Sequence, residues 1–251
     1  MAGEAATDRR VFEITGNNRL DFLQGMVSND ITRLNDGLVY AALLTPQGKY
    51  LADFFLVPVG DAVLLDVKQD IADALLQRLS MYTLRADVAI APSDLRVTRG
   101  LGAAPTGAFV DPRHDTLGWR AYGMPGGDAR IDWDAIRVAA CIPETGIELV
   151  PNETFILEAG FERLHGVDFR KGCYVGQEVT ARMKHKTELR KGLARVAVNG
   201  AAPVGAEITA NGKAAGTLYT QANGQGIAYL RFDRAQGTMQ ADTANVTLIP
   251  A

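Results

Sequence analysis

The sequence predicts an α+β fold, with a body of mixed helices and strands over residues 1–190 and a small β-barrel over residues 191–251. Three observations predict this fold. The composition is that of a globular protein, with 47% hydrophobic and 22% charged residues among 251. Amphipathic helical segments alternate with short β-rich runs in the body. From residue 191 onward the runs are all β-like and are separated by Asn-Gly pairs, which favour tight hairpin turns.

The first part of the body is predicted to be a helix followed by three strands. Residues 18–27 place apolar side chains at helical spacing behind an asparagine that can cap the helix. Residues 39–67 indicate strand, turn, strand, turn and strand. The turn signals are Pro46-Gln47-Gly48 and Gly60-Asp61, and the flanking residues are β-branched or aromatic.

Further elements follow along the chain. Residues 69–80 form the clearest amphipathic helix, with Ile71, Leu75 and Leu79 on one face and acidic residues in the first turn. Residues 87–100 predict a pair of strands around Pro92. The remaining expected elements are a helix over 133–144 that stops near Pro143, a helix after residue 176, and strands over 193–198, 206–210, 215–220, 226–232 and 244–250.

The composition excludes several classes of protein. Two cysteines, Cys141 and Cys173, cannot form a disulfide scaffold. The three histidines are widely spaced, so no dedicated metal site is expected. No run approaches the roughly 18 apolar residues of a membrane span, and the first ten residues do not have the pattern of a signal peptide. We therefore expect a monomeric cytoplasmic protein without a membrane partner.

The formal charge of −3 conceals an uneven distribution. Residues 170–195 contain eight Lys/Arg and two Glu, which is +6 locally, and the remainder is (26 − 8) − (29 − 2) = −9. Clustered basic residues can bind nucleic acid through phosphates. However, the stretch has no interleaved aromatics and no recognised nucleic-acid motif. A positive rim that attracts a polyanionic cofactor or an acidic partner is therefore the simpler interpretation, and direct nucleic-acid binding is not expected.

The octapeptide KGCYVGQE, residues 171–178, is the strongest motif. Two glycines flank Cys173, and good helix formers follow. Cys173 is therefore expected at or just before a helix N-terminus, beside Arg170 and Lys171, where its thiolate would be stabilised. The alternative is a buried structural cysteine, which is the commoner case. Cys141, inside an apolar run, is expected to be a core residue.

KGCYVGQE resembles the KGC-[YF]-x-GQE signature of the YgfZ family, whose folate-binding members are relatives of the glycine-cleavage T-protein, an aminomethyltransferase. Residues 20–34, 43–57 and 142–178 resemble further family segments in the right order. DPRHDTLGWR, residues 111–120, is similar to the DPR…LGWR segment of the branch that includes the mitochondrial iron–sulfur assembly factor. The octapeptide is highly specific, whereas each of the other segments is individually weak.

The resemblance implies a three-part ring of domains around a central folate channel, which here divides the body into about 1–95 and 96–190. It implies a protein that binds tetrahydrofolate or a one-carbon derivative and supports iron–sulfur cluster assembly or repair through the signature cysteine. Three roles of Cys173 are compatible with the resemblance: it ligates a transient iron–sulfur cluster, it exchanges disulfides, or it takes up a one-carbon or other reactive adduct. Client or assembly proteins are the expected partners. The link to tRNA modification would be indirect, through iron–sulfur enzymes.

The resemblance also implies roles for individual residues. Glu158, in an LEAG context, matches the glutamate that hydrogen-bonds the pterin ring. Asp53 matches a catalytic carboxylate of the T-proteins, but Ala52 stands where those enzymes have a second acid. An aminomethyltransferase-like enzyme that transfers a one-carbon unit therefore remains the alternative function. We expect Cys173 and Asp53 to be the reactive residues, and Glu158, Asn29, Asp30, Arg113, Trp119, Lys171, Tyr174 and Gln177 to line the cofactor site.

Several of these residues have ordinary alternatives. Asn29-Asp30 is also a common turn or cap pair. Arg113 and Lys171, like Arg120 and Arg182, are also read as surface charges. Trp119 is equally suited to the core.

Overall fold

The computed structural model describes residues 3–84, 86–185 and 188–250. The chain forms two compact units, one of Met1–Arg130 with Phe161–Val179 and the other of Ile131–Gly160 with Thr180–Ala251. Residues 131–160 thus belong to the unit that contains the C-terminal barrel, whereas the sequence placed them with the body. Lys186 of the basic stretch lies outside the described residues.

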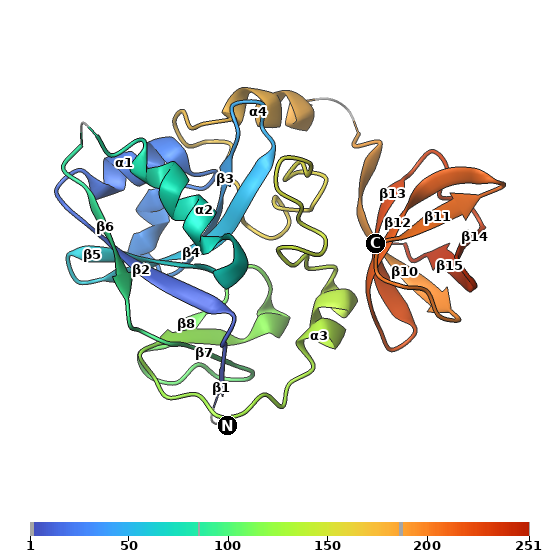
Figure 1. Cartoon of the computed structure of the whole chain (residues 1–251), viewed down its shortest axis with the longest axis horizontal. Helices are drawn as coiled ribbons and strands as arrows, with labels where there is room; N and C mark the ends of the chain where they lie inside the picture. Colours follow the sequence, from blue (N-terminus) through green and yellow to red (C-terminus); the bar gives the residue numbers. More distant parts are fainter. Residues whose placement is uncertain (1–2, 85, 186–187, 251) are drawn as a thin grey trace. The chain divides into compact units, whose positions relative to one another are not determined.

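A five-stranded antiparallel sheet forms the centre of the first unit (Figure 1). Its strands are β2 (Arg9–Thr15), β3 (Val39–Leu44), β4 (Tyr50–Val59), β5 (Ala62–Lys68) and β6 (Ala89–Ser93), in the order β3-β4-β5-β2-β6. The two predicted turns join β3 to β4 and β4 to β5. The bounds of these three strands agree with the sequence pattern within a residue or two.

One face of this sheet carries an apolar core. Alternate residues point to opposite faces of a strand, and Phe54 and Leu56 of β4 join Phe12 of β2 and Leu65 of β5 in one buried cluster. Two helices, α1 (Arg19–Met26) and α2 (Gln69–Ser80), add Leu23, Leu75 and neighbouring residues to the same cluster. The helix predicted over 69–80 is confirmed at both ends.

A second, smaller sheet completes the first unit. Its strands are β1 (Glu4–Ala5), β7 (Val97–Gly100), β8 (Phe109–Val110) and β9 (Trp119–Tyr122), in the order β1-β7-β9-β8. The predicted strand pair around Pro92 is wrong. Pro92 lies within β6 opposite Phe12 of β2, at the edge of the first sheet, and β7 pairs with β1 and β9 instead. Proline is tolerated in an edge strand because its missing N–H faces away from the ladder.

The second unit contains the closed barrel, in the strand order β10-β13-β12-β11-β14-β15. Positive φ angles at Asn211-Gly212 and Asn223-Gly224 match the hairpin turns that these pairs favour. The α+β class with a C-terminal barrel is confirmed. Within the barrel the sequence missed the short β14, and in the first unit it missed β1, β2, β8 and β9. The strands are β10 (Lys191–Asn199), β11 (Ala206–Ala210), β12 (Lys213–Ala222), β13 (Gln225–Arg231), β14 (Thr238–Ala241) and β15 (Ala244–Leu248).

Helix α3 (Trp133–Ala140) belongs to the barrel unit because a buried polar network joins its segment to β12. The Glu148 carboxylate accepts from the Arg137 guanidinium (3.2 Å) and from the Thr220 hydroxyl (2.5 Å). These partners lie 11 and 72 residues from Glu148, and the side chain of Glu148 is fully buried. These buried hydrogen bonds are directional, so they fix the position of residues 131–160 on the barrel.

The chain also contains two short 3-10 turns and a fourth α-helix. Residues Ile31–Asn35 and Asp115–Leu117 form 3-10 turns, and α4 (Gln177–His185) begins within the octapeptide. Within the described ranges, none of the helices has the length and apolar content needed to cross a membrane. Nor do the described residues include a group of three or more His, Cys, Asp or Glu side chains arranged for a metal ion.

Candidate functional site

The loop that carries the octapeptide is fixed by a buried lysine. Lys171 is 7% exposed, and its Nζ lies 2.8 Å from the carbonyl oxygen of Gln24, 2.5 Å from that of Val27 and 2.8 Å from that of Asn29. These carbonyls lie at and just beyond the end of α1, where the helix leaves acceptors without intrahelical partners. All three ammonium hydrogens are therefore used to hold the loop against the end of α1.

Burial lowers the pKa of Lys171 to about 8, and the nearby charges of Asp30 and Asp168 offset part of that effect. The three carbonyl acceptors favour the ammonium form, in which lysine has three hydrogens to donate. We therefore describe Lys171 as a positioning residue for the octapeptide. Its predicted contact with an anionic cofactor would require it to leave these carbonyls.

Asp168 anchors the same loop three residues earlier. Its Oδ1 accepts from the backbone N–H groups of Arg170 (2.7 Å) and Lys171 (3.2 Å), and its Oδ2 pairs with Arg33 (2.8 Å). The Asp168 N–H donates to the carbonyl of Ser28 (3.0 Å). Both anchors thus tie the loop to residues 24–33.

Gly176 fixes the other end of the loop. Its φ is +84°, and a Cβ built there would lie 2.6 Å from the carbonyl oxygen of Thr45. Only glycine permits this approach to the turn between β3 and β4. Gly172 is different, because a Cβ there would meet nothing within 4 Å and its φ is not positive. The fold therefore requires the second glycine of the octapeptide but not the first.

Cys173 lies between these anchors with its side chain exposed. Helix α4 begins at Gln177, four residues later, so the expected position of Cys173 at a helix N-terminus is wrong. The intervening Tyr174 turns inward, and its ring lies 5.0 Å from the Lys171 Nζ. The loop thus presents the Cys173 thiol to solvent, while the side chains of Lys171 and Tyr174 are buried. Cys141 is half-buried at the end of α3.

Asn29 and Asp30 are engaged in local structure. The Asn29 amide donates to the carbonyls of Tyr40 (2.8 Å) and His165 (2.7 Å). Asp30 caps the 3-10 turn by accepting from the Thr32 N–H (3.0 Å). Gln177 is the first residue of α4, and its N–H donates to the Tyr174 carbonyl. The Asn29 carbonyl also accepts from Lys171 Nζ (2.8 Å), so Asn29 supports the octapeptide loop directly.

Asp53 is a buried carboxylate held by two phenols. It is 6% exposed, and its oxygens accept from the hydroxyls of Tyr40 (2.9 Å) and Tyr50 (2.7 Å). Burial and the neighbouring Asp53 charge raise the pKa of Tyr40 well above its ordinary value. Tyr40 therefore stays protonated and donates to the carboxylate.

Arg113 lies next to Tyr40, one of the two phenols that hold Asp53. Its Nε and Nη2 form a bidentate pair with Asp111 (3.0 and 2.8 Å), and its guanidinium lies over the rings of Tyr40 and Phe55. Trp119 instead lies in the core, only 2% exposed, with Gly3 and Gly100 packed against its ring. The structure thus supports the core alternative for Trp119.

A charged network that the sequence did not predict surrounds Phe55. Asp66, fully buried, accepts from Arg9 (2.6 Å), Arg120 (2.7 Å) and Tyr122 (2.9 Å). Burial raises the pKa of Asp66, but the charges of Arg9 and Arg120 outweigh burial and lower it to about 2. The available signal was an aspartate inside the apolar strand AVLLDVK, which is costly to bury without a cation.

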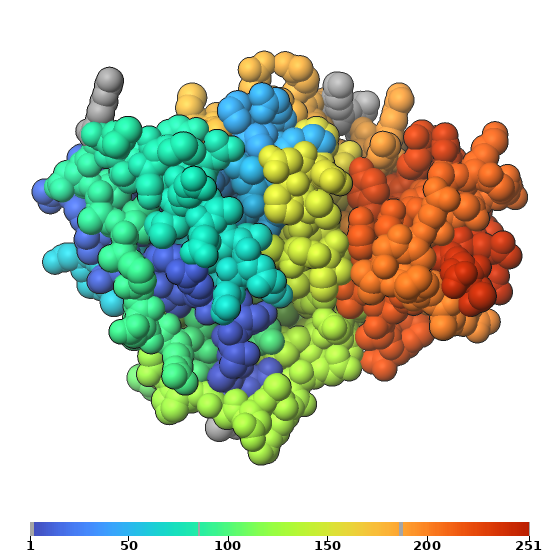
Figure 2. Space-filling view, viewed as in Figure 1, coloured from blue at the N-terminus to red at the C-terminus, as the bar shows by residue number. Residues whose placement is uncertain are grey.

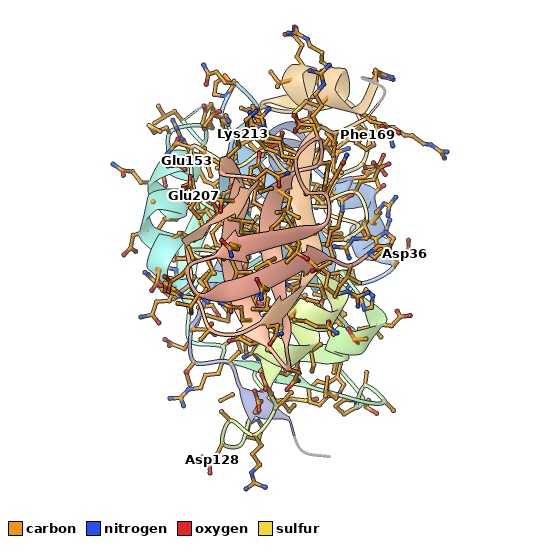
Figure 3. All side chains as sticks on the ribbon, turned by 90° about the vertical axis from the view of Figure 1, so that its right-hand side faces the viewer. Asp36, Asp128, Glu153, Phe169, Glu207 and Lys213 are labelled. Carbon is orange, nitrogen blue, oxygen red and sulfur yellow. The ribbon has the colours of Figure 1, made fainter. Side chains whose placement is uncertain are left out.

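Glu158 belongs to the barrel unit and lines a cavity of about 150 Å³. Its Oε2 accepts from the Tyr229 hydroxyl (2.7 Å), and among the described residues no hydrogen bond reaches Oε1. Burial and Glu158 raise the pKa of Tyr229, so the phenol remains a donor. Glu153, labelled in Figure 3, lines the same cavity. An acidic cavity with one oxygen available suits a ligand rich in N–H donors.

The chain is similar to several known proteins. Residues 190–251 match the CAF17 C-terminal beta-barrel domain. The chain is 28% identical to the mouse mitochondrial iron–sulfur cluster assembly factor IBA57, over 96% of this chain and 80% of that protein. The human protein is also 28% identical, with 92% and 78% covered. The Mycosarcoma maydis homologue is 30% identical over 73% of this chain, which spans only 54% of that protein.

A solved structure shows the fold. The glycine cleavage system aminomethyltransferase T from Bartonella henselae superposes with a TM-score of 0.77 at 14% sequence identity, covering 98% of this chain and 84% of that one. The predicted T-protein-like fold is confirmed. Identity of 14% supports the shared fold alone and carries no argument about activity.

The relatives correct one expectation. The mouse, human and fungal assembly factors are named as mitochondrial proteins, which contradicts the predicted cytoplasmic location. That prediction rested on apolar patterning and on the first ten residues. Folding physics is the same in both compartments, so patterning within the folded units does not distinguish them.

Proposed function

We propose that this protein is an iron–sulfur cluster assembly factor. The single observation that carries the proposal is the similarity to the mouse and human assembly factors over more than nine-tenths of this chain. Its partners would be client or assembly proteins, and any effect on tRNA modification would arise through iron–sulfur enzymes. A monomer is the simplest form for this role.

We further infer that Cys173 is the group that acts on the cluster or its client. Its thiol is exposed on a loop anchored at Asp168, Lys171 and Gly176, so its position is fixed before a partner arrives. Iron and its clusters are held by cysteine thiolates. One thiolate leaves coordination positions open, so a cluster passing through would take its other ligands from a partner protein or a small thiol.

A tetrahydrofolate-type cofactor is the finer part of the proposal. The observed fit is in the barrel unit, where Glu158 Oε1 has no acceptor role toward the described residues and borders the 150 Å³ cavity. Glu158 would accept from the N–H edge of the pterin, while Tyr229 fixes the orientation of its carboxylate. When bound, the folate would supply a carrier for one-carbon units.

The assembly role is tested in cells that lack their own relative and depend on this chain. We expect it to restore the activity of iron–sulfur enzymes such as aconitase, because the proposed role is upstream of those enzymes. If the chain is expressed and folded but the enzymes remain inactive, the assembly role is excluded.

The cofactor is tested separately by calorimetry with tetrahydrofolate. We expect the wild type to bind and Glu158→Gln to lose about tenfold in affinity, since one charge-assisted pair is removed. Glu207→Gln, which changes a glutamate of β11 outside the cavity, is the matched control. Equal affinity in all three proteins would contradict the role of Glu158, and no binding would exclude the cofactor.

The alternative function is a folate-dependent one-carbon transferase. The observation that favours it is Asp53, a buried carboxylate at the position expected for a T-protein acid. Both of its oxygens are already held by phenols, and Ala52 stands beside it in place of a second acid. Turnover of a methylamine-type donor that Asp53→Asn abolishes would establish this function, and folate binding without turnover would exclude it.

A further inference from the structure

A cavity of about 330 Å³ lies in the first unit beside the beginning of β2. In the space-filling view the N-terminal residues of its wall are deep blue and the residues around the end of β6 are green (Figure 2). Its volume is at the lower end of the range for small-molecule sites. The lining residues are Ala5, Ala6, Thr7, Arg9, Arg10, Val11, Pro92, Ser93, Asp94, Leu95, Arg96 and Val97.

The wall of this cavity has two chemical parts. Ala6, Val11 and Val97 are buried apolar residues, and they leave a dry surface that favours an apolar group. The ionisable lining residues are three arginines and a single acid, Asp94. The Arg10 guanidinium is paired with Asp73, so the cavity combines an apolar wall with the guanidiniums of Arg9 and Arg96.

Arg9 is the most buried of the three arginines, with its side chain 10% exposed. Its Nε donates to Asp66 Oδ1 (2.6 Å) and its Nη2 to the Asp66 carbonyl (2.7 Å). Nη1 has no acceptor among the described residues, and it is not one of the buried nitrogens left without a partner. Nη1 is therefore the end of the guanidinium that reaches open space, where Arg9 lines the cavity.

The network behind Arg9 holds its guanidinium in place. Asp66 accepts from Arg9 and Arg120, Asp111 pairs with Arg113, and Asp53 accepts from Tyr40, whose ring lies under the Arg113 guanidinium. Because two hydrogen bonds to Asp66 fix the Arg9 guanidinium, the direction of Nη1 is set before a ligand arrives.

We propose that this cavity binds a small organic anion, namely a carboxylate attached to a short apolar body. The carboxylate pairs with Arg9 Nη1, and Arg96 adds positive charge beside it. The apolar body packs on Val11 and Val97. With about 30 Å³ per water, the cavity has the volume of about eleven waters, which limits the ligand to a short chain or one ring. This site is independent of the function proposed above.

The test is a titration of the whole protein at low salt with hexanoate, followed by NMR or calorimetry. Hexanol carries the apolar body without the charge, and inorganic phosphate carries charge without the body. We expect hexanoate to bind more tightly than either. Arg96→Gln should weaken hexanoate binding severalfold while leaving the fold intact, because the Arg96 side chain is solvent-exposed. Arg130→Gln changes an exposed arginine outside the cavity and should have no effect.

Three results would overturn the proposal. One is the absence of hexanoate binding at millimolar concentration in low salt. Another is binding that is as strong in Arg96→Gln as in Arg130→Gln, which would mean that the Arg96 guanidinium does not attract the carboxylate. The third is equal binding of hexanol, which would mean that the cavity recognises the apolar body and not the charge.

Discussion

The two faces of the five-stranded sheet are built from alternate residues of the same strands, yet they are stabilised in different ways. On one face Phe54 and Leu56 of β4 join an apolar cluster with α1 and α2. On the other face Asp53 and Phe55, from the same strand, lie in a layer of phenols, guanidiniums and carboxylates. Both faces are buried, so burial alone does not decide the chemistry of a sheet face.

The two faces should tolerate different substitutions. Apolar packing is non-directional and responds mainly to volume. The charged face depends on particular ion pairs, such as Asp66 with Arg9 and Arg120. Removing one partner costs more folding free energy than the intact pair contributes, because the other charge is left buried and unpaired. The stability contributed by the apolar face should therefore depend on side-chain volume, and that contributed by the charged face should depend on pH.

The largest expected effect is on the apolar face. Phe54→Ala should destabilise the protein by about 4 kcal/mol, because it removes a fully buried ring and leaves a cavity. The loss, measured by urea unfolding, should be the same at pH 4 as at pH 7. A strong dependence on pH would mean that the two faces are coupled and the comparison is too simple.

Asp66→Asn should cost about 3 kcal/mol at pH 7, since it leaves Arg9 and Arg120 buried without their anion. The pKa of Asp66 in the folded protein, about 2, is below its ordinary value of 3.8. Its contribution is therefore complete above about pH 4 and is lost as the pH falls toward 2, about 2 kcal/mol in all. Urea unfolding from pH 7 to pH 2 should show this loss in the wild type but not in the variant. Identical pH profiles would contradict the assignment.

Tyr50→Phe should have a smaller effect, about 1 kcal/mol, because it removes one hydrogen bond to Asp53 and leaves the ring in place. Tyr40→Phe removes the other bond and is the matched comparison. If both substitutions are neutral in thermal unfolding, Asp53 does not depend on the phenols, and its burial needs another explanation.

The smallest effect is expected at the surface. Arg10 pairs with Asp73 at 2.6 Å, but the Asp73 side chain is 85% exposed. Arg10→Gln should therefore change stability by less than about 0.5 kcal/mol in urea unfolding. A loss comparable to that of Asp66→Asn would show that exposure does not separate the two kinds of ion pair.

Local elements could be predicted from the sequence because their signals are local. The helix over 69–80 and the hairpins of residues 39–67 follow from periodicity and turn residues a few positions apart. The anchors of the octapeptide could not be predicted in this way. Lys171 contacts carbonyls 142 to 147 residues away, and Arg120 meets Asp66 across 54 residues. No pattern within one element reports such pairs.

The same limit explains the misplaced features. The helix begins at Gln177, as the sequence predicts, but Cys173 lies four residues before it, on the loop that Gly176 holds against Thr45. Trp119 was a candidate for stacking on a cofactor until its packing against Gly3 and Gly100 placed it in the core. The candidate reactive thiol itself was identified from the sequence, because the octapeptide is local and specific.

The central claim is that Cys173 serves function and not stability. The most direct test replaces it with alanine in cells that rely on this chain, and measures iron–sulfur enzyme activity together with the unfolding free energy of the purified protein. Cys141→Ala, the other cysteine of the chain, is the control. We predict that Cys173→Ala abolishes the enzyme activity and shifts stability by less than about 0.5 kcal/mol, as for an exposed side chain. Full enzyme activity in the Cys173→Ala cells would contradict the account.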